Sequence, residues 1–260
     1  MLTTDYVPGA PNWVDLGTRD VEGAAGFYRA LFGWGFRSAG AGGYGFFLLD
    51  GRVVAGVGPL DEEGARAGWT LYFHSADVDA TAGAVERAGG SVRTGPLDVL
   101  AAGRTAACSD PAGARFALWR PGERAGLDAV GAPNTLWWTQ LYVLDVPAAR
   151  DFYRSVFAWE TEDLVLVRGA AYTVVAPAGG PGGPHGGIMA LTELPAEVSA
   201  GLLGWHPYFA VADCDAAVAA AVAHGGTVAI PAETAAGVGR QATLRDPAGA
   251  LFSVNASAAG

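Results

Sequence analysis

Basic residues and cysteine are both scarce in this chain of 260 residues. Its 16 lysine and arginine residues stand against 26 acidic ones, so the formal net charge is −10. That balance argues against a protein that binds a nucleic-acid backbone or an anionic membrane surface. The two cysteines, Cys108 and Cys214, lack the spacing of a metal site. We therefore expect two buried free thiols in a reducing compartment.

Long apolar runs and targeting signals are missing as well. No stretch reaches the roughly 18 apolar residues of a membrane-spanning helix. The opening MLTTDYVPGAPNW has no basic region followed by an apolar run, so no secretory signal is expected. Hydrophobic residues make up 51% and charged residues 16%, which argues against disorder. These features predict a cytoplasmic monomer or homodimer that binds a small-molecule ligand and neither nucleic acid nor membrane.

What the chain does contain is an internal repeat. The segment WVDLGTRDVEGAAGFYRALFGW (13–34) matches WTQLYVLDVPAARDFYRSVFAW (138–159). The segment GWTLYFHSADVDATAGAVERAGGSV (68–92) matches GWHPYFAVADCDAAVAAAVAHGGTV (204–228). An Asp-Pro-Ala-Gly turn followed by an alternating strand also occurs twice. Such self-similarity predicts that one building block is used several times.

Each matching segment shows the pattern of a strand, a capping aspartate and a helix. The helices are expected to begin after Asp20, Asp77, Asp145 and Asp213. Runs typical of β-strands follow each helix. The sequence therefore predicts an α+β fold of four βαβββ modules that form two similar domains, with curved mixed β-sheets and outer helices. The predicted boundaries are a first domain at 1–120 (modules 12–60 and 68–119), a linker at 121–134, and a second domain at 135–260 (modules 135–194 and 204–256).

Side chains of a strand alternate between two faces. In the first and last strands of the modules one face is hydrophobic, and we expect it to pack under the helices. The other face, here called the cup face, mixes aromatic rings with hydrogen-bonding groups, which is typical of a small-molecule pocket. A domain interface filled by aromatic packing is the alternative. The cup-face residues expected to bind a substrate are Trp13, Tyr72, His74, Trp119, Trp138, Gln140, Tyr142, Tyr208 and Asn255.

Two further cup-face residues are candidate catalytic groups. Asp15 is the only carboxylate expected inside a cup, and burial against Trp13 would raise its pKa and make it a base. A rim position in water is the alternative. His206 could transfer a proton or donate a hydrogen bond to a ligand, or it could simply satisfy a neighbour. A further histidine lies in the segment PAGGPGGPHGG (177–187). Its glycines and prolines predict a flexible hairpin or lid, in which His185 is solvated or closes the site.

The paired modules, the FYRALFGW and FYRSVFAW helices and the strands after the Asp-Pro-Ala-Gly turns resemble the vicinal oxygen chelate superfamily. That superfamily includes glyoxalase I, extradiol dioxygenases, fosfomycin-resistance enzymes and bleomycin-binding proteins. The resemblance spans nearly the whole chain. It implies the fold described above and, in the enzymes of the superfamily, a divalent metal bound inside a cup.

The resemblance also implies where metal ligands would lie. Those positions hold Trp13, Thr70, Ala117, Trp138, His206 and Ser253, with further hairpin positions near Gly56–Gly58 and Gly187–Met189. A metal site needs several oxygen or imidazole donors that converge on one point. Only His206 is a plausible ligand among these residues. We therefore expect that the usual divalent metal is absent and that the protein has no cofactor.

The resemblance and the missing ligands together predict a metal-independent enzyme of lyase, isomerase, hydroxylase or oxygenase type. Its substrate would be a small oxygenated or aromatic metabolite. One alternative is a non-catalytic protein that sequesters a small molecule, as the bleomycin-binding members do. A second alternative is a metal-dependent glyoxalase or dioxygenase whose ligands lie at other positions than those carried over here.

Overall fold

The computed structural model describes residues 2–40, 42–60, 64–166, 169–179, 182–194 and 201–257. The elements of the first half are β1 (Pro11–Thr18), α1 (Val21–Phe32), β2 (Gly35–Ser38), β3 (Gly45–Leu49), β4 (Arg52–Pro59), β5 (Gly68–His74), α2 (Val78–Arg87), β6 (Ser91–Val99), β7 (Gly103–Ser109) and β8 (Arg115–Pro121). The elements of the second half are β9 (Leu136–Val143), α3 (Val146–Phe157), β10 (Glu160–Val165), β11 (Ala171–Ala176), β12 (Gly186–Ala190), the 3₁₀ turn η2 (Leu191–Glu193), β13 (Gly204–Ala210), α5 (Cys214–Ala223), β14 (Thr227–Ala235), β15 (Gly239–Arg245) and β16 (Leu251–Ser257).

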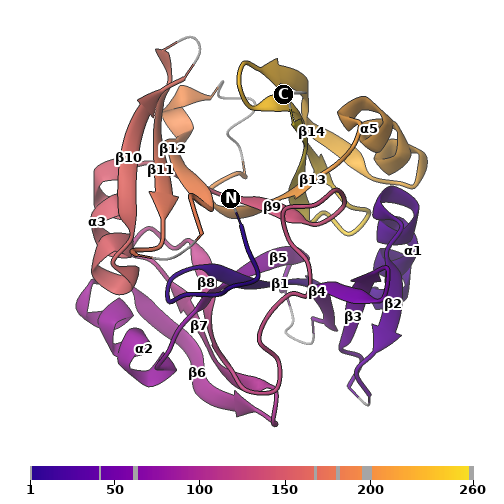
Figure 1. Ribbon diagram of the computed structural model, residues 1–260. Coiled ribbons are helices and arrows are strands. Elements are labelled where there is room, and N and C mark those ends of the chain that lie inside the picture. The colour runs from indigo at the N-terminus through magenta and orange to yellow at the C-terminus, as the bar shows by residue number, and fades with distance from the viewer. Residues whose placement is uncertain are drawn as a thin grey trace. The chain divides into compact units, whose positions relative to one another are not determined.

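These elements form four βαβββ modules, and most of their helices and strands are labelled in Figure 1. Module 1 contains β1, α1 and β2–β4; module 2 contains β5, α2 and β6–β8; module 3 contains β9, α3 and β10–β12; module 4 contains β13, α5 and β14–β16. The strands follow two orders of eight, β2-β3-β4-β1-β5-β8-β7-β6 and β10-β11-β12-β9-β13-β16-β15-β14. Parallel and antiparallel pairs occur in both. The predicted α+β fold of four modules with mixed sheets is confirmed.

An aspartate caps every α-helix in the described part of the chain. The side chains of Asp20, Asp77, Asp145 and Asp213 each accept a hydrogen bond of 2.8–3.0 Å from the backbone N–H three residues ahead. This contact satisfies one of the free N–H groups at a helix start. The predicted helix starts are therefore confirmed. None of these helices combines the length and apolarity needed to cross a membrane.

The chain folds into two compact units. Unit 1 comprises Met1–Trp13, Leu71–Gly126 and Trp138–Trp205, and unit 2 comprises Val14–Thr70, Leu127–Trp137 and His206–Gly260. Unit 1 therefore contains most of modules 2 and 3, and unit 2 contains most of modules 1 and 4. The sheets follow the halves of the sequence repeat, whereas each unit combines modules from both halves. The domain limits 1–120 and 135–260 consequently stay a prediction.

The hydrophobic strand faces form the core of each unit, as the alternation predicts. In unit 1, Phe73 and Phe116 are at most 1% exposed and pack against Phe157 of α3, with ring centroids 5.3 and 6.0 Å apart. In unit 2, Phe209 is fully buried and lies 5.3 Å from Phe32 of α1. Burial of such aromatic rings contributes much of the favourable free energy of folding.

The repeated Asp-Pro-Ala-Gly turn has a structural role in each unit. In unit 1, Oδ1 of Asp110 accepts hydrogen bonds from the backbone N–H groups of Ala112 and Ala114. Its Oδ2 accepts the hydroxyl of Tyr153 at 3.2 Å, and that hydroxyl accepts the indole N–H of Trp205 at 2.8 Å. The turn of one half thus holds the tyrosine of the FYR helix of the other half.

Unit 2 contains the same series of hydrogen bonds between an aspartate, a tyrosine and a tryptophan. Tyr28 donates to Oδ2 of Asp246 at 3.2 Å, and Trp69 Nε1 donates to the Tyr28 hydroxyl at 3.1 Å. Burial raises the pKa of Asp246 and of Tyr28, as it does for their counterparts in unit 1. The Asp-Pro-Ala-Gly turn therefore has the same role in both units, where its aspartate binds a buried tyrosine of the core.

The two cysteines are free and buried, as expected from the sequence. Burial raises the pKa of the Cys108 thiol to about 12, and it also raises the pKa of Cys214. A protonated, buried thiol is a poor nucleophile and a poor metal ligand. Both cysteines thus belong to the packing of the units.

Candidate catalytic and ligand-binding faces

The cup face of module 3 carries a chain of side-chain hydrogen bonds. Trp138 Nε1 donates to the hydroxyl of Tyr172 at 2.8 Å, and that hydroxyl donates to Gln140 Oε1 at 2.7 Å. Gln140 is 4% exposed, and its Nε2 donates to the backbone oxygen of Leu141 at 3.2 Å. The structure therefore brings together two of the predicted residues, Trp138 and Gln140, through a tyrosine that the sequence analysis missed.

Module 1 repeats this arrangement with a carboxylate. Tyr44 donates its hydroxyl to Asp15 Oδ2 at 3.3 Å. Asp15 pairs in register with Gly56 on β4, just as Gln140 pairs with Gly187 on β12. Tyr44 and Tyr172 therefore occupy equivalent positions. The signal that could have revealed them is this recurrence of a tyrosine at the start of a hairpin strand in both halves.

The two tyrosines fill the space beside the glycines of the hairpin strands. A Cβ atom added to Gly56 would collide with the hydroxyl of Tyr44, and one added to Gly187 would collide with the hydroxyl of Tyr172. These glycines lie at positions where the superfamily resemblance implies a metal ligand. In this chain the same space holds a phenol ring, because glycine leaves room for it.

Module 4 has a polar cup face that lies within unit 2. Tyr208 on β13 pairs with Ser253 on β16, which pairs with Thr243 on β15. The hydroxyls of Thr243 and Ser253 lie 2.8 Å apart and form a buried hydrogen bond. We define the module-4 cup face by the alternating positions of these strands, namely His206, Tyr208, Gln241, Thr243, Ser253 and Asn255.

The burial of this face is nearly complete. His206 and Tyr208 are 6% and 7% exposed, and Asn255 is fully buried. Asn255 Nδ2 donates to the backbone oxygen of Val238 at 3.4 Å. Its Oδ1 has no hydrogen-bond partner among the described residues. Three predicted site residues, His206, Tyr208 and Asn255, are thus brought onto one face, and their roles stay predictions.

The cup face of module 2, in unit 1, is mostly apolar. Trp119 is 7% exposed, donates its Nε1 to the backbone oxygen of Arg124 at 3.0 Å, and packs where a Cβ on Gly103 would meet its ring at 2.6 Å. Tyr72 pairs with Ala117, and His74 pairs with Trp119. His74 is half-buried, its Nδ1 has no partner, and burial lowers its pKa.

The remaining predicted residues lie on other parts of these faces. Trp13 on β1 and Tyr142 on β9 are buried, at 5% and 6% exposure. Asp15 belongs to β1 in the first sheet, whereas His206 belongs to β13 in the second. The two candidate catalytic residues therefore lie on different cup faces. Both residues belong to unit 2, and their catalytic roles stay predictions.

His185 differs from its prediction as a lid or solvated residue. It is 2% exposed and lies against Trp159, with ring centroids 4.8 Å apart. Its Nδ1 lies 3.2 Å from the Thr139 hydroxyl, and burial lowers the pKa of the imidazole to about 3. The glycines and prolines before it misled the interpretation, because the described end of the segment joins the core of unit 1. Residues 180 and 181 of the predicted loop lie outside the described residues.

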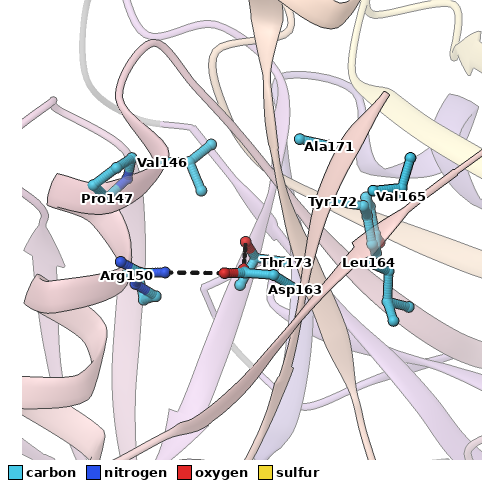
Figure 2. A pocket seen from close by; sticks show the side chains of 9 residues that line it. All are labelled: Val146, Pro147, Arg150, Asp163, Leu164, Val165, Ala171, Tyr172 and Thr173. Atoms are coloured by element: carbon cyan, nitrogen blue, oxygen red, sulfur yellow. Dashed lines mark hydrogen bonds and ion pairs between the residues drawn. The ribbon is translucent and has the colours of Figure 1, made fainter. Parts of the chain in front are cut away.

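A cavity of about 340 Å³ lies where the N-terminus of α3 meets β10 and β11 (Figure 2). Arg150 and Asp163 form an ion pair of 3.2 Å there, and Thr173 donates to the same carboxylate at 2.6 Å. The sequence analysis did not predict this cavity. Its lining residues are Val146, Pro147, Arg150, Asp163, Leu164, Val165, Ala171, Tyr172 and Thr173. Its charged groups are paired with each other, so it offers no candidate acid or base.

The residues at the implied metal positions do not fit a divalent metal. Tryptophan, alanine and glycine have no side-chain atom that coordinates a metal, and Tyr44 and Tyr172 fill the space beside the hairpin glycines. Within the described residues, no three His, Cys, Asp or Glu side chains are grouped closely enough to hold an ion. The donor set thus differs from the several converging oxygen or nitrogen ligands of a catalytic metal site.

Comparison with known proteins places the chain in a family. Residues 10–118 match the model described as Glyoxalase/Bleomycin resistance protein/Dioxygenase superfamily, and residues 139–255 match a glyoxalase-like domain. The anthracycline biosynthesis protein DnrV of Streptomyces peucetius is 41% identical, with 96% of this chain and 94% of that protein aligned. The putative glyoxylase CFP32 of Mycobacterium bovis is 36% identical, with 96% of both chains aligned.

Solved structures share the fold at low sequence identity. The 2,3-dioxygenase LapB from Pseudomonas sp. KL28 superposes with a TM-score of 0.64 at 14% identity, over 96% of this chain and 92% of that one. The Mn(II)-bound glyoxalase from Novosphingobium aromaticivorans gives 0.64 at 17% identity, over 95% and 82%. The predicted resemblance is confirmed. This chain belongs to the glyoxalase/bleomycin resistance protein/dioxygenase superfamily, in a form with two domain-model matches.

Proposed function

We propose that this protein is a metal-independent enzyme that acts on a small oxygenated or aromatic metabolite. The observation that carries the proposal is the set of residues at the implied metal positions. Two of these positions hold glycine, and Tyr44 and Tyr172 fill the space beside them. The relative DnrV is named an anthracycline biosynthesis protein, which supports an aromatic substrate. A net charge of −10 argues against a nucleic-acid or anionic-membrane partner, and we propose a cytoplasmic monomer or homodimer.

The reaction class that these residues can serve without a metal is proton transfer, as in an isomerase or a lyase. His206 would take a proton from one atom of the substrate and return it to another, so that the imidazole ends in its starting state. Tyr208, on the same strand face, would hold a substrate oxygen. Asp15, which accepts a hydrogen bond from Tyr44, is the alternative base on the module-1 cup face.

The test uses protein dialysed against a chelator, with its metal content measured by mass spectrometry. Conversion of a panel of hydroxylated quinones is then followed by liquid chromatography and mass spectrometry. We expect conversion by the metal-free protein and a loss of about 100-fold or more in His206→Gln, since a general acid–base group contributes at least that much. His224→Gln is the matched control, because His224 is exposed at the end of α5. Asp15→Asn tests the alternative base.

Two other results would replace the proposal. Conversion that disappears on chelation and returns with manganese or iron would favour a metal-dependent member of the superfamily. A compound that binds tightly and is recovered unchanged after hours would favour the alternative function, a protein that sequesters its ligand. Retained activity in both His206→Gln and Asp15→Asn would remove both residues from the mechanism.

A further inference from the structure

We infer that the ligand binds at the module-4 cup face and that Asn255 accepts a hydrogen bond from a hydroxyl group of an uncharged ligand. This inference rests on the proposed function, since it concerns a small molecule bound on a cup face. It adds the face that is used, the residue that recognises the ligand and the chemical group that is recognised.

The carboxamide of Asn255 has one polar atom that is bonded and one that is not. The residue is fully buried, its Nδ2 donates to the Val238 oxygen, and its Oδ1 has no partner. Rotating the amide would set Oδ1 against that carbonyl oxygen, so Oδ1 is the atom that lacks a bond. A buried acceptor without a donor destabilises the folded protein, because it has lost its hydrogen bonds to water and gained none in return. Proteins rarely leave such a group unsatisfied, and a bound molecule is one source of the missing donor.

The surroundings of Asn255 define the kind of donor. Gln241 and Ala210 flank it in register on β15 and β13. The hydroxyls of Thr243 and Ser253 already pair with each other. None of the six residues of the module-4 cup face is a lysine, arginine, aspartate or glutamate. A ligand with a formal charge would lose its hydration here without gaining an ion pair, so an uncharged ligand fits this face.

A hydroxyl on an aromatic ring meets these requirements best. It supplies one O–H donor to the unpaired oxygen, and its ring can pack against a side chain such as Tyr208, which is 7% exposed. A carboxylate or phosphate on the ligand would present acceptors to an atom that is itself an acceptor. The geometry therefore selects against anionic groups at the position facing Asn255.

The equivalent face of module 2 offers a comparison inside the same chain. There Trp119 occupies the position of Asn255, since Trp119 pairs with Thr105 as Asn255 pairs with Gln241. The indole N–H of Trp119 is already bonded to Arg124. His74 Nδ1 also lacks a partner on this face. However, Ala117 stands where module 4 has Ser253, so the face has fewer groups to hold an oxygenated ligand.

The inference can be tested with 2-naphthol, a planar aromatic alcohol that is uncharged at pH 7, and its methyl ether as the probe without a hydroxyl group. Dissociation constants are measured by quenching of tryptophan fluorescence in metal-free buffer at pH 7. We expect the native protein to bind 2-naphthol about tenfold more tightly than the ether, because the ether leaves Asn255 Oδ1 unpaired. In Asn255→Leu, which keeps the size and removes the acceptor, the two affinities should become equal.

Matched variants separate recognition from general damage. Asn12 in unit 1 is also fully buried, and both polar atoms of its side chain lack partners among the described residues. Asn12→Leu should therefore keep the tenfold preference. Asn255→Asp, which keeps an acceptor, should keep it too. If Asn255→Leu does not fold, judged by near-ultraviolet circular dichroism, Asn255→Ala replaces it.

Each outcome decides the inference. Equal affinities in the native protein, no binding of 2-naphthol, or a preference that persists in Asn255→Leu and Asn255→Ala would overturn it. A preference that vanishes only in these two variants supports it. The proposed function fails separately: a protein that shows the Asn255-dependent preference but converts no substrate is a binding protein with the inferred site. If the protein converts a substrate and substitution of Asn255 has no effect, the proposed function stands and the inferred binding site is refuted.

Discussion

His185 lies among aromatic rings at 2% exposure, and burial lowers its pKa to about 3. An unfolded chain would bind a proton at this residue near pH 6.5. The unfolded state therefore takes up the proton first, and the stability that the neutral form contributes is lost as the pH falls from about 6.5 towards 3. The folded protein should become less stable on acidification for this reason.

The corresponding prediction compares the native protein with His185→Leu. Between pH 7 and pH 5, the stability of the native protein relative to the variant should fall by about 2 kcal/mol, since each pH unit below 6.5 costs about 1.4 kcal/mol for one such group. Urea unfolding at the two pH values measures this difference. His224→Leu, at the exposed end of α5, is the control. Equal pH dependence of the native protein and His185→Leu would contradict the assignment.

Two glycine substitutions in unit 2 should have opposite effects. Ala at position 56 would drive a methyl group into the Tyr44 hydroxyl, so Gly56→Ala should lower the free energy of unfolding by about 1–3 kcal/mol. Gly26 is exposed within α1, and a Cβ there meets no atom. Gly26→Ala should therefore raise the stability by about 0.5–1 kcal/mol. Thermal unfolding of both variants checks the pair, and a stabilising Gly56→Ala would refute the packing of Tyr44.

At the scale of single residues, the sequence predicted the cup-face positions from strand alternation alone, and the structure places His206, Tyr208 and Asn255 on one such face. It missed Tyr44 and Tyr172, because their partners depend on how hairpin strands align with a strand distant in sequence. It was wrong for His185, because glycine and proline content indicates local flexibility and says nothing about packing against Trp159.

At the scale of elements, the repeated Asp–Tyr–Trp chains join the turn before a last strand to a helix of the other half. Tyr153→Phe should destabilise the protein by about 1–3 kcal/mol, since both the Asp110 carboxyl group and the Trp205 N–H lose a buried partner. Tyr28→Phe should have a similar effect, because the same contacts occur in unit 2. Chemical denaturation measures both values. If the free energy of unfolding changes by less than about 0.3 kcal/mol in either variant, the hydrogen bonds of that tyrosine add little stability.

The elements themselves were largely predictable. The aspartate caps at Asp20, Asp77, Asp145 and Asp213 are local signals, because the cap and the N–H group that it binds are three residues apart. The surface cavity beside Arg150 was not predictable in this way. It depends on how close the start of α3 comes to β10, which neither segment encodes by itself.

At the scale of the whole molecule, each unit draws its core from both halves of the chain. The contacts between Phe32 and Phe209 and between Phe116 and Tyr153 join residues of different halves inside one unit. A separated half would expose these aromatic surfaces to water. We therefore predict that residues 1–128 and residues 129–260, expressed separately, do not form folded monomers.

Size-exclusion chromatography and near-ultraviolet circular dichroism test this prediction. Each half should be unfolded, aggregated or self-associated by itself, and mixing the halves should restore the spectrum of the intact chain. A half that elutes as a monomer and unfolds cooperatively would contradict it. Such a half would also support the predicted domain limits at 120 and 135 as the boundaries of independent folding units.

The amino-acid sequence by itself determined the type of module, the starts of the helices, the buried strand faces and the superfamily. The first three features depend on periodicity and on caps that act within one turn of helix, and the superfamily was indicated by the resemblance of the repeated motifs, so all four can be recognised without knowing the fold. Only the tertiary structure decided that Tyr28 bonds to Asp246, 218 positions away, that tyrosines pack beside the hairpin glycines, and that Asn255 Oδ1 has no partner. Each of these depends on which atoms of distant segments meet in a close-packed interior, and no local pattern specifies such contacts.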